Sequence, residues 1–178
     1  RLDDAGLAAL PEQVRSVGDA ERSYYRACDE LWRRWSGAGD AFVHRASGAS
    51  LALLSGTYRA IGGLPIPMHG EDAALCRMVL ERGGRVVTIA DGGTRTSARL
   101  DGRAVGGCGD ALSKRASQED PECDDALVPI VELRRLAIYR RTFGVRDDAV
   151  RMRTPLRYSE LLRELGEANV LLSEVPLV

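Results

Sequence analysis

Two adjacent carboxylates are the residues of this sequence whose type and position best suit chemistry. Glu71 and Asp72 follow Gly70 at the start of the segment 71–82, in which apolar residues recur at helical spacing. The free amides and the dipole at the start of a helix favour negative charge there. An ionised carboxylate in that position can take a proton from a hydroxyl group. Asp72 is therefore a candidate general base.

The same pair has a structural interpretation that the sequence leaves open. Acidic residues in the first turn stabilise a helix by about 0.3–1 kcal/mol each, without any part in chemistry. Taken alone, Glu71 and Asp72 fit this structural interpretation better than the catalytic one. The choice between them depends on the residues that surround the pair.

The residues before the pair could bring a ligand close to the backbone. Three small residues open a predicted buried strand, and they leave room for such an approach: Gly48, Ala49 and Ser50. Gly62 and Gly63 permit positive φ and a sharp reversal of the chain. A rigid loop with prolines at 65 and 67 then leads to Glu71.

A second cluster contains arginines that could bind phosphate. Arg99 and Arg103 lie four positions apart, so they would share a face of a helix, and two glycines follow at 106–107. A guanidinium fork suits a diphosphate leaving group or a phosphorylated acceptor. Surface pairing with Asp101 or Asp110 explains the two arginines equally well, and both interpretations remain open.

The order of these elements resembles the carboxyl half of family-two glycosyltransferases, which have the GT-A fold. The resemblance covers roughly residues 45–110, and a bacterial subgroup also matches it at Thr94–Arg103. The matching runs are Ser47-Gly48-Ala49-Ser50, Ile61-Gly62-Gly63, Gly70-Glu71-Asp72 and Gly84-Arg85-Val86-Val87. Each run alone would mean little, whereas the ordered set is specific.

The resemblance implies an inverting transfer of a sugar from a nucleotide-sugar donor to a hydroxyl acceptor. Asp72 would deprotonate the acceptor hydroxyl, and Glu71 would orient the acceptor or the neighbouring loop. The residues expected to bind substrate are Gly48, Ala49, Ser50, Gly63, Arg99 and Arg103.

The sequence departs from the family in its metal-binding residues. Family members place an Asp-x-Asp in the amino half to bind a divalent cation, and these 178 residues contain none. Thr94–Ser97 stand where many relatives carry a further histidine ligand. We therefore expect Mg²⁺ or Mn²⁺ in the complete enzyme and no metal on this chain. We also expect the donor-binding half to be missing, and the fragment to be inactive alone.

The composition limits which binding partners and which cellular compartment are expected. The net charge is −1, which gives no reason to expect nucleic acid or an anionic membrane. Four cysteines without Cys-x-x-Cys spacing favour reduced thiols in the cytoplasm. No signal peptide or apolar run of the roughly 18 residues needed for a membrane span is present.

Periodicity predicts an α/β fold, a partial GT-A-like mixed sheet with several flanking helices and helix-rich overall. The expected strands are 47–55 and 86–90, and the expected helices are 5–16, 19–36, 56–61, 71–82, 126–142 and 155–168. Residues 1–110 would form the glycosyltransferase part, 111–125 a flexible acidic loop, and 126–178 a helical extension. An uncovered sheet edge would make a homodimer possible.

A function from a different class competes with the enzyme. The chain could be a non-catalytic helical interaction or regulatory module. In that case the helix at 71–82 is structural and residues 126–168 form a docking pair of helices.

Overall fold

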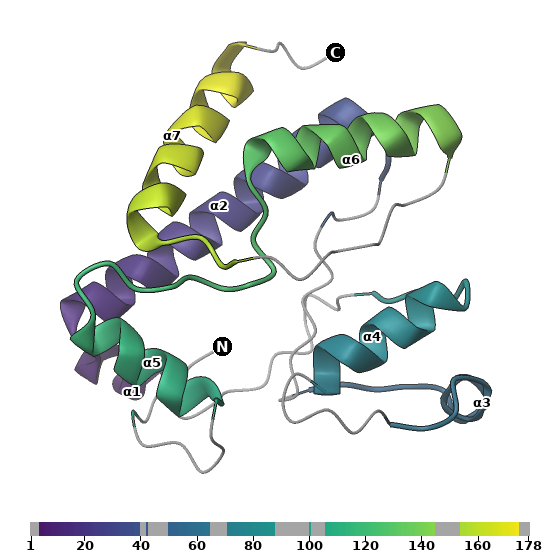
Figure 1. Ribbon diagram of the computed structural model, residues 1–178, viewed down its shortest axis with the longest axis horizontal. Coiled ribbons are helices and arrows are strands. Elements are labelled where there is room, and N and C mark those ends of the chain that lie inside the picture. The colour runs from purple at the N-terminus through teal and green to yellow at the C-terminus, as the bar shows by residue number, and fades with distance from the viewer. Residues whose placement is uncertain are drawn as a thin grey trace. The chain divides into compact units, whose positions relative to one another are not determined.

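The chain folds into two compact units. The computed structural model describes residues 4–39, 42, 50–64, 71–87, 100, 106–144 and 154–174. Unit 1 comprises residues 1–9 and 44–111, and unit 2 comprises 10–43 and 112–178. Residues 10–43 thus join the carboxyl-terminal helices, whereas the sequence grouped them with 44–110. The elements are labelled in Figure 1.

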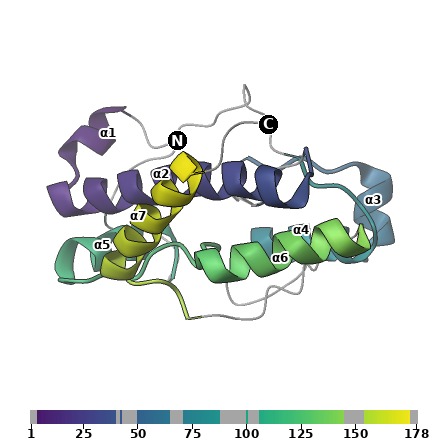
Figure 2. The ribbon, with the colours of Figure 1, turned by 90° about the horizontal axis from the view of Figure 1, so that it is seen from above.

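Unit 2 is built around the long helix α2 (Glu12–Ser36). Helices α6 (Ile130–Phe143) and α7 (Tyr158–Glu174) both lie against α2, point in different directions, and contact one another only slightly (Figures 1 and 2). The largest fully buried side chains of this unit are Trp32, Tyr24, Leu31, Leu133 and Leu161. The aromatic residues, although few, therefore form the centre of the core.

The amino-terminal helices break at a different place from the one predicted. The sequence suggested helices at 5–16 and 19–36, but α1 spans Asp4–Ala9 and α2 runs unbroken through Gly18. Pro11 at the N-cap of α2 restricts the residue before it, which separates the two helices. Gly18 costs a helix about 1 kcal/mol relative to alanine. Burial of Val14, Val17 and Ala20 around it offsets that cost.

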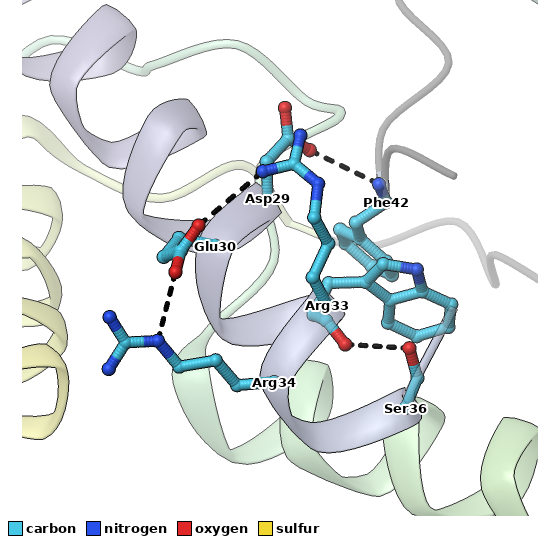
Figure 3. Close-up of polar contacts among 7 residues, drawn as sticks. Asp29, Glu30, Arg33, Arg34, Ser36 and Phe42 are labelled. Carbon is cyan, nitrogen blue, oxygen red and sulfur yellow. Dashed lines mark hydrogen bonds and ion pairs between the residues drawn. The ribbon is translucent and has the colours of Figure 1, made fainter. Parts of the chain in front are cut away.

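The carboxyl end of α2 is closed by glycine and by a folded-back segment. Gly37 has φ 68°, and its amide donates to the Arg33 carbonyl at 3.1 Å. Figure 3 shows the Phe42 amide, which donates to Asp29 Oδ1 at 3.1 Å. The Phe42 ring packs on Trp32 with the ring centres 5.0 Å apart. The chain beyond α2 thereby covers its buried tryptophan.

In unit 1, two Gly-Gly pairs end two helices in the same way. Helix α3 (Ser55–Ala60) is terminated by the glycines that follow it. Gly62 has φ 88°, and the Gly63 amide donates to the Tyr58 carbonyl at 3.0 Å. Helix α4 (Glu71–Glu81) is terminated in the same way. Gly83 has φ 72°, and the Gly84 amide donates to the Val79 carbonyl at 2.9 Å. Both are Schellman motifs. The predicted reversal with positive φ at 62–63 is confirmed.

The predicted α/β mixed sheet is wrong. The residues that the structure describes contain no strand, and their one β-bridge is an isolated antiparallel pair, Glu122 with Arg157. Residues 50–54 and 84–87 carry no strand pairing, and Leu54 and Val87 are 79% and 66% exposed. The remaining residues of both predicted strands, 47–49 and 88–90, lie outside the described part.

The physical reason for this error lies in what a strand requires. Alternating and β-branched residues show that a segment suits a strand, but a strand also needs a partner backbone for its amides and carbonyls. The described residues provide no such partner to 50–54 or 84–87. The sheet edge from which we expected a dimer is therefore not formed by them either.

The remaining helices agree better with the sequence. Helix α6 begins at Ile130 rather than 126 because Pro129 is its N-cap, and α7 extends to Glu174 rather than 168. Helix α5 (Cys108–Ser117) occupies the first part of the segment 111–125, which was expected to be a flexible loop. None of the helices within the described ranges is long and apolar enough to cross a bilayer.

The acidic run at 118–125, expected to be part of a flexible loop, fixes the start of α7. Asp120 accepts hydrogen bonds from the Ser159 amide and the Ser159 hydroxyl, both at 2.8 Å. Arg157, the residue before α7, has no acceptor side chain for these amides, so Asp120 replaces the usual N-cap. The Arg157 amide donates to Glu160 Oε2 at 2.8 Å, which completes the reciprocal half of a capping box.

This cap makes the stability of unit 2 sensitive to acid. The Ser159 amide and hydroxyl lower the pKa of Asp120, so the folded state favours its ionised form. The resulting stabilisation is present above the ordinary aspartate pKa of about 4 and disappears as the pH falls through the lowered value. Asp120→Asn should therefore unfold at a lower urea concentration than the wild type near neutral pH, and the two midpoints should converge in acid, once the pH lies below the lowered pKa of Asp120.

Tryptophan fluorescence measures this transition, because both tryptophans, Trp32 and Trp35, lie in α2. Glu119→Gln is the matched control and should leave the midpoint unchanged at both pH values. Equal midpoints for Asp120→Asn and the wild type near neutral pH would contradict a capping role for Asp120.

Candidate functional site

The candidate base lies where the sequence placed it, in the first turn of α4. Asp72 is half-buried, and its Oδ1 accepts a hydrogen bond from the Ala73 amide at 2.8 Å. Glu71 is exposed. The amide holds the Asp72 carboxylate at the end of the helix, where the dipole favours its charge. Two carboxylates of different exposure thus stand side by side at one helix terminus.

A small apolar cluster holds α4 against the end of α3. Ile61, Leu75 and Val79 are buried together, and Met78 and Val86 pack at the edge of this cluster. Leu75 lies about one turn after Asp72, so the cluster fixes the part of the helix next to the acidic turn. The Arg82 side chain donates to the carbonyl of Ala60, which joins the carboxyl ends of the two helices.

Cys76, one turn after Asp72, is buried. Burial raises the pKa of its thiol, and the charge of Asp72 raises it further. A thiol in such an environment stays protonated at neutral pH and is a poor nucleophile. Cys76 therefore contributes packing beneath the acidic turn rather than covalent chemistry.

The structure describes only some of the other residues that were predicted to form the site. Gly63 has φ 97°, and a Cβ atom there would lie 3.5 Å from the Tyr58 hydroxyl. Ser50 is exposed and does not belong to the cluster that holds α4. Four of the predicted residues lie outside the described part of the chain: Gly48, Ala49, Arg99 and Arg103.

Within unit 1, the structure relates the Gly-Gly turn to the acidic helix. Ile61 immediately precedes Gly62 and is buried with Leu75, which belongs to the same helix as Asp72. Of the residues expected to bind substrate, Gly63 alone is thereby related to the base, because it follows α3, whose end packs against α4. The predicted contribution of Ser50 stays a prediction.

The described residues do not suit a divalent cation. They contain no group of three or more His, Cys, Asp and Glu side chains that could hold a metal ion. Glu71 and Asp72 supply two adjacent carboxylates, fewer ligands than Mg²⁺ or Mn²⁺ usually takes from a protein and its substrate together.

Unit 2 contains a buried ion pair that the sequence did not reveal. Glu21 Oε1 accepts from Arg115 Nη2 at 2.7 Å and from the Asp124 amide at 2.8 Å. The two side chains are 10% and 16% exposed, so both charges are largely removed from water. The available signal was the position of Glu21 on the apolar stripe of α2, between Val17 and Tyr24.

This ion pair is structural. Burial raises the pKa of Glu21, while Arg115 and the Asp124 amide oppose that rise. Neighbouring Cys123 is also buried, and its pKa is raised to about 12, chiefly by that burial and then by Glu21. A protonated thiol and a fully engaged carboxylate leave no reactive group at this position.

A second buried polar contact joins the three main helices of unit 2. The Tyr24 hydroxyl donates to the Val128 carbonyl at 2.7 Å and lies 3.2 Å from Glu164 Oε2. The same Glu164 oxygen accepts from the Ile130 amide at 2.6 Å. Burial raises the pKa of Tyr24 well above its usual range, so the phenol remains a donor. We refer to these four residues as the Tyr24 junction.

Comparison with known proteins adds no relative from which a role could be transferred. No protein-family model matches the chain, and no curated protein or solved structure matches it either. A functional assignment therefore depends on the acidic turn, its supporting residues and the resemblance of the ordered motifs.

The buried ion pair predicts an asymmetric response to mutation. Arg115→Met leaves the Glu21 carboxylate buried without its cation, which should lower the free energy of unfolding by about 2–3 kcal/mol. The double variant Glu21→Gln with Arg115→Met should recover most of this loss, because glutamine keeps an oxygen for the Asp124 amide. Urea unfolding near neutral pH measures both values.

Acid should reduce the loss in free energy of unfolding that Arg115→Met causes. Since the pKa of Glu21 is raised in the folded state, the folded state binds the extra proton, and stability rises as the pH falls through that window. Arg22→Met is the matched control on α2, because the pair of Arg22 with Asp19 is exposed and worth well under about 1 kcal/mol. A double variant no more stable than Arg115→Met would contradict the buried-charge explanation.

Proposed function

We propose that these residues form the acceptor-side part of an inverting glycosyltransferase, in which Asp72 is the general base. The observation that carries the proposal is the half-buried Asp72 carboxylate, oriented by the Ala73 amide at the start of a packed helix. The order of the sequence motifs around Asp72, which resembles that of family-two glycosyltransferases, supports the same function. The proposal depends on this site and does not require the predicted sheet.

The proposed reaction transfers one proton and one glycosyl group. The acceptor oxygen forms a bond to the anomeric carbon while its proton passes to the Asp72 carboxylate. The bond between that carbon and the phosphate oxygen breaks, and a nucleoside diphosphate leaves. Attack opposite the leaving group inverts the anomeric configuration. Glu71, which is exposed beside Asp72, would orient the acceptor.

The residues expected to bind the substrates remain part of the proposal. Gly63 would let the acceptor or donor approach the backbone beside Tyr58. Gly48, Ala49 and Ser50 would line the sugar pocket, and Arg99 and Arg103 would bind phosphate. The divalent cation and most donor contacts would come from a separate donor-binding part.

The reaction would take place in the cytoplasm. All four cysteines are free thiols, of which Cys28, Cys76 and Cys123 are buried and Cys108 is exposed. Free thiols are typical of a reducing compartment. This observation supports the location and carries no information about the substrate.

A non-catalytic interaction module is the alternative, and one observation favours it. Unit 2 has a well-packed helical core, and α6 leaves large apolar side chains exposed. In this alternative, Glu71 and Asp72 only stabilise the start of α4. The effect of Asp72 on turnover separates the two functions.

The test is turnover by the full-length gene product with a panel of nucleotide sugars and acceptors. Asp72→Asn should lower kcat by about a thousandfold, the usual contribution of a positioned general base, with the circular dichroism spectrum unchanged. Release of the nucleoside diphosphate gives the rate. Glu81→Gln, an exposed change on the same helix, is the control and should retain full activity.

Two results would contradict the proposal. One is near-normal turnover by Asp72→Asn, which would remove this residue from the mechanism. The other is the absence of nucleotide-sugar turnover by the wild type across the panel, which would favour the interaction module.

A further inference from the structure

The exposed side of α6 combines apolar and cationic side chains. Val131 and Phe143 are 77% and 63% exposed, and Ile138 and Tyr139 lie between them along the helix. The opposite side of the helix is buried against unit 2 through Leu133, Leu136 and Ala137. Val131 and Phe143 therefore lie mostly outside the core. We refer to the four apolar residues Val131, Ile138, Tyr139 and Phe143 as the α6 surface.

The charges beside the α6 surface are predominantly positive. Helix α6 contains four arginines, Arg134, Arg135, Arg140 and Arg141, and one acidic residue, Glu132. Glu132 is partly buried and pairs with Arg135 through two contacts of 2.7 and 2.9 Å. Every fully exposed charge on this helix is thus an arginine. The net charge of −1 for the whole chain conceals this local excess.

Several of these side chains are held in place. The Arg134 guanidinium lies 5.8 Å from the centre of the Trp35 ring on α2. Tyr139 and Phe143 pack on one another with ring centres 4.7 Å apart. The Arg140 side chain donates to the Gly144 carbonyl at the end of the helix. These contacts orient two aromatic rings of the α6 surface and two of the arginines beside it.

We propose that the α6 surface binds an anionic phospholipid membrane, with the helix lying in the plane of the interface. Exposed apolar side chains and nearby arginines supply the two attractions that hold a helix at such an interface, apolar burial and charge. Guanidinium groups match lipid phosphates, and a tyrosine or phenylalanine ring suits the boundary between headgroup and acyl chain. Since none of the described helices can span a bilayer, the attachment would be peripheral.

Two other occupants fit the surface less well. A second copy of the chain would bring the arginines of two α6 helices against each other, and like charges at an interface are unfavourable. An acidic protein segment would match the charge. However, the apolar residues lie along the exposed side of a single helix, where a deformable lipid layer can cover them more fully than a rigid partner.

Vesicle flotation with the 178-residue chain tests the proposal. We expect binding to vesicles of phosphatidylcholine mixed with phosphatidylglycerol, and none to phosphatidylcholine alone. Arg141→Gln should weaken the binding by about fivefold, and raised salt should weaken it for the wild type. Phe143→Ser should weaken it by about tenfold or more. Both positions are exposed, so the helical circular dichroism signal should not change.

Helix α7 provides matched controls for the two variants. Arg163→Gln and Leu162→Ser change exposed residues of the same kinds on another helix, and they should bind as the wild type does. Equal binding by all four variants, or no binding to the anionic vesicles, would overturn the proposal.

Two further outcomes would show that the α6 surface binds a partner other than lipid. Binding to polyglutamate but not to anionic vesicles would indicate an acidic protein. A dimer in sedimentation that Phe143→Ser dissociates would indicate a second copy. The proposal is independent of the glycosyltransferase function, because vesicle binding is measured without turnover.

Discussion

The Tyr24 hydroxyl is the buried polar group on which the packing of unit 2 depends. It donates to the Val128 carbonyl just before α6 and lies beside Glu164 of α7, whose carboxylate accepts from the Ile130 amide. A buried amide or carbonyl without a partner costs about 1–3 kcal/mol, so these groups specify how α6 and α7 approach α2. Apolar burial around Leu31, Trp32 and Leu133 supplies the driving force, and the junction selects the arrangement.

The two units differ in what their polar residues do. In unit 2 the carboxylates of Glu21, which is buried, and Glu164, which is partly buried, accept hydrogen bonds from backbone amides and side chains of the packed helices, which leaves them no chemistry to perform. In unit 1 the carboxylates of Glu71 and Asp72 stand at a helix terminus, exposed or half-buried, with a small cluster behind them. A group that reacts with a substrate has to be reachable, and this difference is why the proposed chemistry is assigned to α4.

Local signals in the sequence predicted local structure well. The Gly-Gly pairs after residues 61 and 82, and the acidic first turn at Glu71, place the helix boundaries of unit 1 within about one residue, because each signal acts through neighbouring backbone groups. The sheet could not be predicted in the same way, since a strand depends on a distant partner. The contacts of Asp120 with Ser159 and of Glu21 with Arg115 join residues far apart in the chain, so composition indicated a loop where the structure has a cap.

Native-state amide hydrogen exchange tests the central role of the Tyr24 junction most directly. If the junction joins α2, α6 and α7 into one cooperative unit, their slowest amides share one opening free energy. Tyr24→Phe, which leaves the Val128 carbonyl without its donor, should then lower that energy by a similar amount of about 1–2 kcal/mol in all three helices. Exchange in α4 should not change. A loss of protection confined to the residues around position 24, or one that includes α4 equally, would contradict this view of the junction.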